Sequence, residues 1–181
     1  FFAVGNGEIE HRILQLNAAE AVTVSKRFPG LVRIQVQEYA VVALELAEDG
    51  SLRGLLSNGS SVPYERSELA SPRPLIAGWE DSGLKSELCK VLGTIPPEHL
   101  QDVSEIRPSP SESYDDRILL YTRSQYEVVT RISYLAEKIT LLDDYVYEMR
   151  NDGRTTGRIV LLETDYGEGF ETVEQETEKK E

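Results

Sequence analysis

The sequence contains a single cysteine, Cys89, and only two histidines, His11 and His99. One cysteine excludes an intrachain disulfide and any zinc site built from several cysteines. The histidines fit no metal-binding spacing, and no glycine pattern of a nucleophile elbow accompanies them, so a Ser-His-Asp hydrolase has no support. No apolar run approaches the ~20 residues of a membrane-spanning helix, and no signal-peptide pattern opens the chain.

Basic residues are scarce, with 19 Lys and Arg against 32 Asp and Glu and a formal net charge of −13. Residues 1–38 are neutral, because four basic residues balance four acidic ones, so the whole acidic excess follows residue 38. A field of this sign repels phosphate backbones and anionic lipid, which argues against binding to nucleic acid or to lipid headgroups.

The acidic pairs do not form a catalytic dyad. Asp115-Asp116 and Asp143-Asp144 are adjacent in the sequence, so the two side chains of each pair diverge on a strand or a helix, unlike the carboxylates of a glycosidase. No glycine-rich loop links a strand to a helix, so a nucleotide site has no support. We therefore predict no catalytic residue, no cofactor and no metal.

The chain changes character between residues 27 and 44. Phe28-Pro29-Gly30 predicts a tight turn. Val32, Ile34 and Val36 then alternate with polar residues, which is typical of a strand with one solvent-exposed face. From residue 39 to 44 the run is apolar throughout, as in a strand covered on both faces. We predict a domain junction at Glu38-Tyr39, while an ordinary hairpin inside one domain is the alternative.

The rest of the pattern predicts an α+β fold, mainly an antiparallel β-sheet with two longer helices at about 84–92 and 134–150 and a short helical turn near 97–100. Hairpins are expected at 41–57 and 116–132, and a last strand at 157–165. Cys89 lies near the apolar face of the first helix, where we expect a buried structural thiol. In the second helix, apolar residues recur at helical spacing at Leu135, Ile139, Leu142, Val146 and Met149.

The stretch from residue 27 to 43 resembles the junction between the POTRA domain and the β domain of the bacterial division protein family called DivIB or FtsQ. There an Arg, an aromatic residue, a Pro, an alternating strand and a Glu before small apolar residues come in this order. The matching residues are Arg27, Phe28, Pro29, Leu31, Ile34, Val36, Glu38, Val42 and Ala43. The family usually has Pro one or two positions after the Glu, where this chain has Tyr39-Ala40. The order of elements over residues 39–173 also resembles the family's β domain.

The resemblance implies three parts. Residues 1–38 would be a truncated POTRA remnant, which we expect to be loosely packed or partly disordered, because its sheet lacks a neighbour. Residues 39–173 would be the β domain, and residues 174–181 a disordered acidic tail. The resemblance also implies a cell-membrane protein anchored by a single helix upstream of this piece, with this fragment on the extracytoplasmic side at the division septum.

The function implied by the resemblance is that of a non-enzymatic scaffold. It would bind small single-pass coiled-coil division proteins, DivIC/FtsB-like and FtsL-like, and influence the septal wall synthases through them. No later strong strand covers the outer edge of the strand at 157–165, so a partner strand is expected to add there, and the family's partners dock at the last strands of the β domain. The predicted partner-binding residues are Tyr166, Gly167, Glu168, Gly169, Phe170, Glu171, Thr172 and Val173.

Three alternatives stay open. Tyr166 and Phe170 are core residues in the simplest alternative. An acid-based cell-wall (peptidoglycan) hydrolase should show a pocket of converging carboxylates with perturbed pKa values. A peptidoglycan-binding module should show a groove with exposed aromatic residues.

Overall fold

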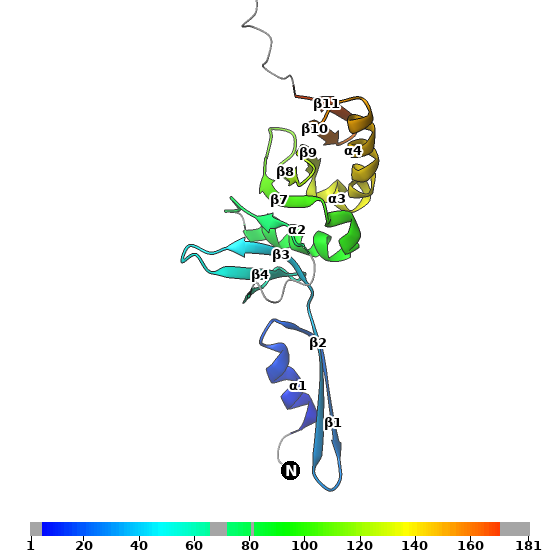
Figure 1. The fold of residues 1–181 in the computed structure, drawn as a ribbon. Coiled ribbons are helices and arrows are strands. Elements are labelled where there is room, and N and C mark those ends of the chain that lie inside the picture. Colours follow the sequence, from blue (N-terminus) through cyan, green and yellow to red (C-terminus); the bar gives the residue numbers. More distant parts are fainter. Residues whose placement is uncertain (1–4, 66–71, 81, 171–181) are drawn as a thin grey trace, which may run out of the picture. The chain divides into compact units, whose positions relative to one another are not determined.

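The computed structural model describes residues 5–65, 72–80 and 82–170. These residues fall into two compact units. Unit 1 holds residues 5–65 and 82–94, and unit 2 holds residues 72–80 and 95–170. Figure 1 shows the helices and strands of both units along the chain.

Unit 1 begins with a helix, α1 (Asn6–Leu14), and two strands, β1 (Ala19–Arg27) and β2 (Leu31–Glu38). The two strands form an antiparallel hairpin of their own. Side chains of α1 satisfy backbone groups of β1: the Asn6 amide donates to the Val24 carbonyl over 3.1 Å, and the Val24 N–H donates to the Glu10 carboxylate over 2.8 Å. The tight turn predicted at Phe28-Pro29-Gly30 and the strand predicted after it are confirmed here.

The predicted burial of β2 is wrong. The alternation of its side chains indicated one covered face, but every residue of β2 is exposed. Val32, Ile34 and Val36 are 41%, 46% and 47% exposed. Helix α1 lies against β1, where Val24 is buried, but it buries none of its own residues and leaves the apolar side chains of β2 exposed. Alternation reports which side chains share a face, and a covering layer decides whether that face is buried.

The second part of unit 1 is a three-stranded antiparallel sheet of β3 (Val41–Leu46), β4 (Leu52–Leu56) and β5 (Ser61–Pro63), with helix α2 (Ser82–Thr94). The hairpin predicted at 41–57 and the helix predicted at 84–92 are confirmed. An ion pair of 2.8 Å joins Lys85 on α2 to Glu45 on β3. A Cβ on Gly93 would lie 2.7 Å from the Ser57 Cβ, so the end of α2 approaches the end of β4 closely.

Cys89 on α2 is completely buried. Burial raises the pKa of its thiol to about 11, which outweighs the nearby positive charge of Lys85. A thiol with this pKa stays protonated near neutral pH and is a poor nucleophile. The prediction of a structural thiol is confirmed.

Unit 2 is a mixed sheet with helices. Its strands lie in the order β6, β7, β8, β9, β10, β11. Their bounds are β6 (Leu75–Ile76), β7 (Val103–Pro108), β8 (Arg117–Thr122), β9 (Tyr126–Arg131), β10 (Gly157–Leu161) and β11 (Asp165–Gly169). The pairs β6/β7 and β9/β10 are parallel, and the others are antiparallel. The helical turn predicted near 97–100 is the 3₁₀ helix η2 (Pro97–Leu100).

The long helix predicted at 134–150 is present, with an interruption. It runs as α3 (Ile132–Lys138), a 3₁₀ turn η3 (Ile139–Leu141) and α4 (Leu142–Asn151). Four members of the predicted apolar stripe belong to the core, since Leu135, Ile139, Leu142 and Met149 are each at most 2% exposed, whereas Val146 is half-buried. The core side of the sheet is supplied by alternate strand residues, among them Ile118, Leu120, Val128 and Ile159. The α+β fold class is therefore confirmed.

Candidate functional site

The last described strand, β11, ends the sheet of unit 2, so its outer edge has no strand partner among the described residues. The Phe170 N–H donates to the Thr156 carbonyl over 3.4 Å. Strand residues two apart point the same way, so Glu168 and Tyr166 also turn their backbone groups toward β10. The N–H and C=O groups of Asp165, Gly167 and Gly169 therefore point away from the sheet. An edge of this kind can accept a further strand.

This edge differs from the one that the sequence predicted. We predicted that the strand at 157–165 has an uncovered outer edge, which is wrong. β10 ends at Leu161, and β11 pairs with its outer side, with Val160 opposite Tyr166 and Gly157 opposite Gly169. β11 reads Asp-Tyr-Gly-Glu-Gly, which has weak strand propensity, so pairing and packing rather than local preference place it there.

The inner face of β11 requires glycine. A Cβ on Gly167 would lie 2.8 Å from the Met149 Sδ, and a Cβ on Gly169 would lie 3.0 Å from the Arg154 Cδ. The two glycines thus let β11 lie directly against α4 and the residues after it. They also leave the outer edge without side chains that would shield it.

Arg154 gives this edge partial cover. Its Nη1 donates to the outward carbonyl of Gly167 over 3.2 Å, and its Nη2 pairs with the Asp152 carboxylate. The Arg154 side chain is 41% exposed. An exposed ion pair of this kind contributes little stability, so an incoming strand can displace it at small cost.

The outer face of β11 carries the predicted aromatic anchors. Tyr166 is 48% exposed and Phe170 is 44% exposed. The Phe170 ring lies 5.9 Å from the Arg158 guanidinium, which in turn pairs with Glu127 at 2.7 Å. The structure thus brings the predicted residues 166–170 together at one sheet edge. The other three predicted residues, Glu171, Thr172 and Val173, lie outside the described residues.

Gly157 on β10 decides how closely β11 can pair. A Cβ at this position would lie 2.7 Å from the Met149 Cε and 3.0 Å from the Gly169 Cα, and it would clash with the Glu168 carbonyl oxygen. We expect Gly157→Ala to push β11 away from β10 and to cost roughly 1–3 kcal/mol, as overpacking does. Urea unfolding measures this cost. The matched control is Gly30→Ala, where a Cβ meets nothing within 4 Å; equal stabilities of the two variants would contradict the close packing.

A second polar cluster surrounds Arg131 at the end of β9. Its guanidinium lies 4.5 Å from the Tyr114 ring and 5.0 Å from the Tyr134 ring. Its Nε donates to Asp116 over 2.7 Å, and its Nη1 lies 3.9 Å from Glu163. Both carboxylates face a cation, so neither suits a general acid with a raised pKa. Sequence reasoning missed this cluster because its members come from segments up to 49 positions apart, between Tyr114 and Glu163.

Asp116 makes the stability of this cluster depend on pH. Burial alone would raise the pKa of its carboxyl, but hydrogen bonds from Arg131 and Ser133 outweigh burial and lower it. A lowered folded-state pKa means stability that is present above the unfolded pKa and is lost as pH falls through the folded pKa.

We therefore expect Asp116→Asn to cost about 1–2 kcal/mol at pH 7, because a charge-assisted hydrogen bond is lost, and to cost progressively less as the pH falls below 4. Urea unfolding at several pH values measures both effects. Asp115→Asn is the matched control, since it removes the same charge from an exposed neighbour. A pH-independent difference between wild type and Asp116→Asn would contradict this role.

The remaining chemical candidates are not brought together. His11 is exposed on α1 beside Gln15, and His99 lies in η2 of the other unit. Within residues 5–65, 72–80 and 82–170, no group of three or more His, Cys, Asp and Glu side chains is placed to hold a metal ion. No helix in the same ranges is long and apolar enough to cross a membrane.

The fold and the edge define a class of protein: an α+β domain with a helix-supported sheet whose last described strand has one edge without a strand partner among the described residues. A protein named cell division protein DivIB from Paenibacillus polymyxa is 40% identical to this chain over 166 residues, which cover 91% of this chain and 63% of that protein. Cell division protein DivIB from Bacillus subtilis is 25% identical over 170 residues, which cover 94% of this chain and 63% of that protein. The chain thus spans less than two thirds of the length of these relatives.

A solved structure shares the fold. It is the major extracytoplasmic domain of the trans isomer of the bacterial cell division protein DivIB from Geobacillus stearothermophilus, which matches with a TM-score of 0.51 and 25% identity over 64% of this chain and 98% of that chain. No family model matches the chain. On the strength of these relatives, the chain belongs to the DivIB/FtsQ family of bacterial cell division proteins.

Proposed function

We propose that this chain is the extracytoplasmic part of a membrane-anchored division protein and acts as a non-enzymatic scaffold at the septum. The observation that carries the proposal is the outer edge of β11, with three outward-facing residues, two of them glycine, beside the exposed Tyr166 and Phe170. The partners are small single-pass coiled-coil division proteins of the DivIC/FtsB and FtsL types. Septal wall synthases are reached through these partners.

Binding at this edge combines three contributions. Backbone hydrogen bonds from strand addition give the register. Tyr166 and Phe170 supply apolar contact area, since aromatic residues dominate interface energies. Acidic residues follow this edge in the sequence, with Glu163 to Glu178 containing no Lys, Arg or His. Their field attracts a basic partner segment and makes the association rate depend on salt.

The domain organisation is part of the proposal. Residues 1–38 are the C-terminal half of a POTRA domain, residues 39–173 the β domain and residues 174–181 an acidic tail. The uncovered apolar face of β2, with Val32, Ile34 and Val36 exposed, supports the view that the first part is a piece of a larger domain.

The experiment is a pull-down from solubilised membranes of Paenibacillus polymyxa with the 181-residue chain as bait. We expect enrichment of small single-pass coiled-coil proteins, with septal synthases in smaller amounts. The same chain incubated with purified peptidoglycan should neither release soluble fragments nor sediment with it. Fragment release would favour the hydrolase, and sedimentation without retained membrane proteins would favour the peptidoglycan-binding module.

A further inference from the structure

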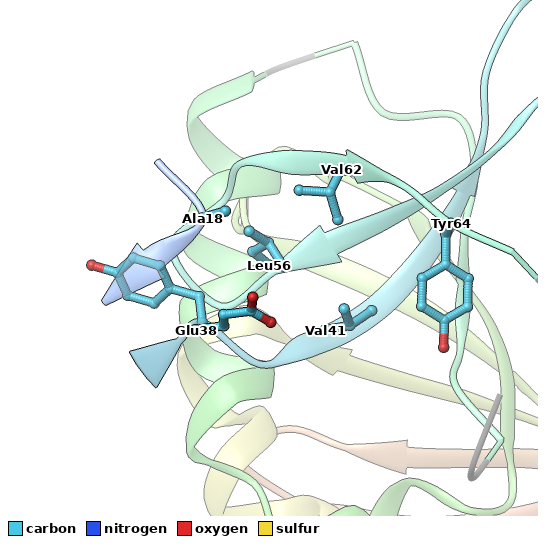
Figure 2. A pocket seen from close by; sticks show the side chains of 7 residues that line it. Ala18, Glu38, Val41, Leu56, Val62 and Tyr64 are labelled. Atoms are coloured by element: carbon cyan, nitrogen blue, oxygen red, sulfur yellow. The ribbon is translucent and has the colours of Figure 1, made fainter. Parts of the chain in front are cut away.

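A pocket of about 250 Å³ lies in unit 1, where the chain passes from β2 into β3. Val41, Leu56, Val62 and Tyr64 line one side, and residues 18 and 38–39 line the other. Figure 2 shows these side chains around the hollow. None of them belongs to β11, so this is a different site from the edge described above.

Sheet register explains why these side chains gather. Val41 pairs with Leu56, and Gly54 pairs with Val62, so their side chains share one face of the β3–β4–β5 sheet. Gly54 lets this face pack tightly, because a Cβ there would lie 3.0 Å from the Tyr64 ring and 3.1 Å from Val41. A larger residue at 54 would push the Tyr64 ring and Val41 apart.

Two hydrogen bonds hold the other side of the pocket in place. The Tyr39 N–H donates to the Ala18 carbonyl over 3.0 Å. The Asn58 amide donates to the Asn17 carbonyl over 2.9 Å. These hydrogen bonds connect the start of the β1–β2 hairpin to Tyr39 and to the turn after β4. The walls of the pocket are therefore held in place before any partner binds.

The pocket combines apolar walls with one acidic group. In Figure 2 the Glu38 carboxylate is directed toward Leu56 and Val41. Among the described residues, this carboxylate has no ion-pair partner. A carboxylate beside apolar walls complements a side chain with an apolar stem and a cationic head, which is the chemistry of Lys and Arg.

The volume indicates one side chain rather than a cofactor. Sites for small molecules usually measure about 300–1,000 Å³, and a water molecule takes up about 30 Å³. A pocket of about 250 Å³ lies below this range and has room for one long side chain.

The free edge of β5, beside the pocket, favours a partner that binds through a side chain rather than by strand addition. β5 is the last strand of its sheet. The Tyr64 N–H and the Ser60 carbonyl form hydrogen bonds with β4. The backbone groups of the alternate residues Ser61 and Pro63 therefore point away from β4. Proline has no N–H, which weakens backbone addition of a partner strand at this edge.

We propose that this pocket binds a single Lys or Arg side chain from an extended segment of a partner protein, as a docking point separate from β11. The stem lies against Val41, Leu56 and Val62, and the cationic head pairs with Glu38. This inference does not rest on the proposed function, because it needs only the pocket and its charge.

The test is a titration of isotope-labelled chain with two blocked tripeptides, Gly-Lys-Gly and Gly-norleucine-Gly, followed by the methyl resonances of Leu56 and Val62. The two peptides share an apolar stem and differ in the cationic head. We expect saturable shifts with the lysine peptide and at least fivefold weaker binding of the norleucine peptide, with a preference that shrinks as salt is added.

The matched variants are Glu38→Gln and Glu48→Gln, both at exposed positions. Glu38→Gln should bring the lysine peptide to the affinity of the norleucine peptide, and Glu48→Gln should change nothing. Equal binding of the two peptides, an unchanged Glu38→Gln, or shifts that bypass Leu56 and Val62 would each overturn the proposal. Binding at β11 is measured separately, so failure here leaves the scaffold proposal intact.

Discussion

Leu142→Asp should destabilise the chain by about 3–5 kcal/mol, the range for an unpaired charge placed in a core. Leu142 is the first residue of α4 and is 1% exposed. Its side chain belongs to the same apolar stripe as Ile139 and Met149, which the helices bury in unit 2. An aspartate there either stays charged without a partner or is protonated at the cost of a large pKa shift.

Urea and thermal unfolding followed by circular dichroism measure this effect. The neighbouring residue supplies the control, because Leu141 is 36% exposed and Leu141→Asp adds the same charge one position earlier. We expect that control to change stability by less than about 1 kcal/mol. Similar melting of Leu142→Asp and wild type would show that the stripe is not core.

Tyr166→Ala with Phe170→Ala should weaken binding to the coiled-coil division partners at least tenfold. Truncating aromatic anchors at an interface costs about 2 kcal/mol or more, and both rings are exposed in the free chain. The melting temperature should stay within a few degrees of wild type for the same reason. Isothermal titration with the soluble segment of a DivIC/FtsB-like partner measures the change.

Two controls distinguish the loss of an aromatic anchor on β11 from the loss of exposed surface elsewhere. Tyr147→Ala removes a ring of α4 that is 68% exposed and lies outside β11, so it should leave the affinity unchanged. Deletion of residues 174–181 should have a far smaller effect than the double variant. Normal binding by a folded Tyr166→Ala, Phe170→Ala chain would place the interface elsewhere.

The parts of the fold that follow from local signals could be predicted from the sequence. The hairpins at 41–57 and 116–132 and the helix after β9 each carry their own turn residues or helical spacing, so residues close in the chain determine them. The buried thiol at Cys89 follows in the same way from its place beside an apolar helix face.

The parts that depend on distant residues could not be predicted. β11 is a strand because glycines at 157, 167 and 169 let it pack against β10 and the end of α4, although its own sequence has weak strand propensity. The exposure of β2 reflects the position of α1, which lies against β1 and leaves the β2 side chains exposed, and no alternation of side chains reveals this. The Arg131 cluster and the Glu38 pocket join segments that only the folded chain brings together.

Amide hydrogen exchange at Gly167 and Gly169 tests the central claim most directly, because strand addition on β11 engages the outward backbone groups of these residues. The measurement compares the free chain with the chain saturated by its coiled-coil partner. We predict that exchange at Gly167 and Gly169 slows at least tenfold on binding, while the amides of Glu48 and Asp49 in the β3–β4 turn are unaffected. Unchanged exchange at both glycines in a fully formed complex would contradict it.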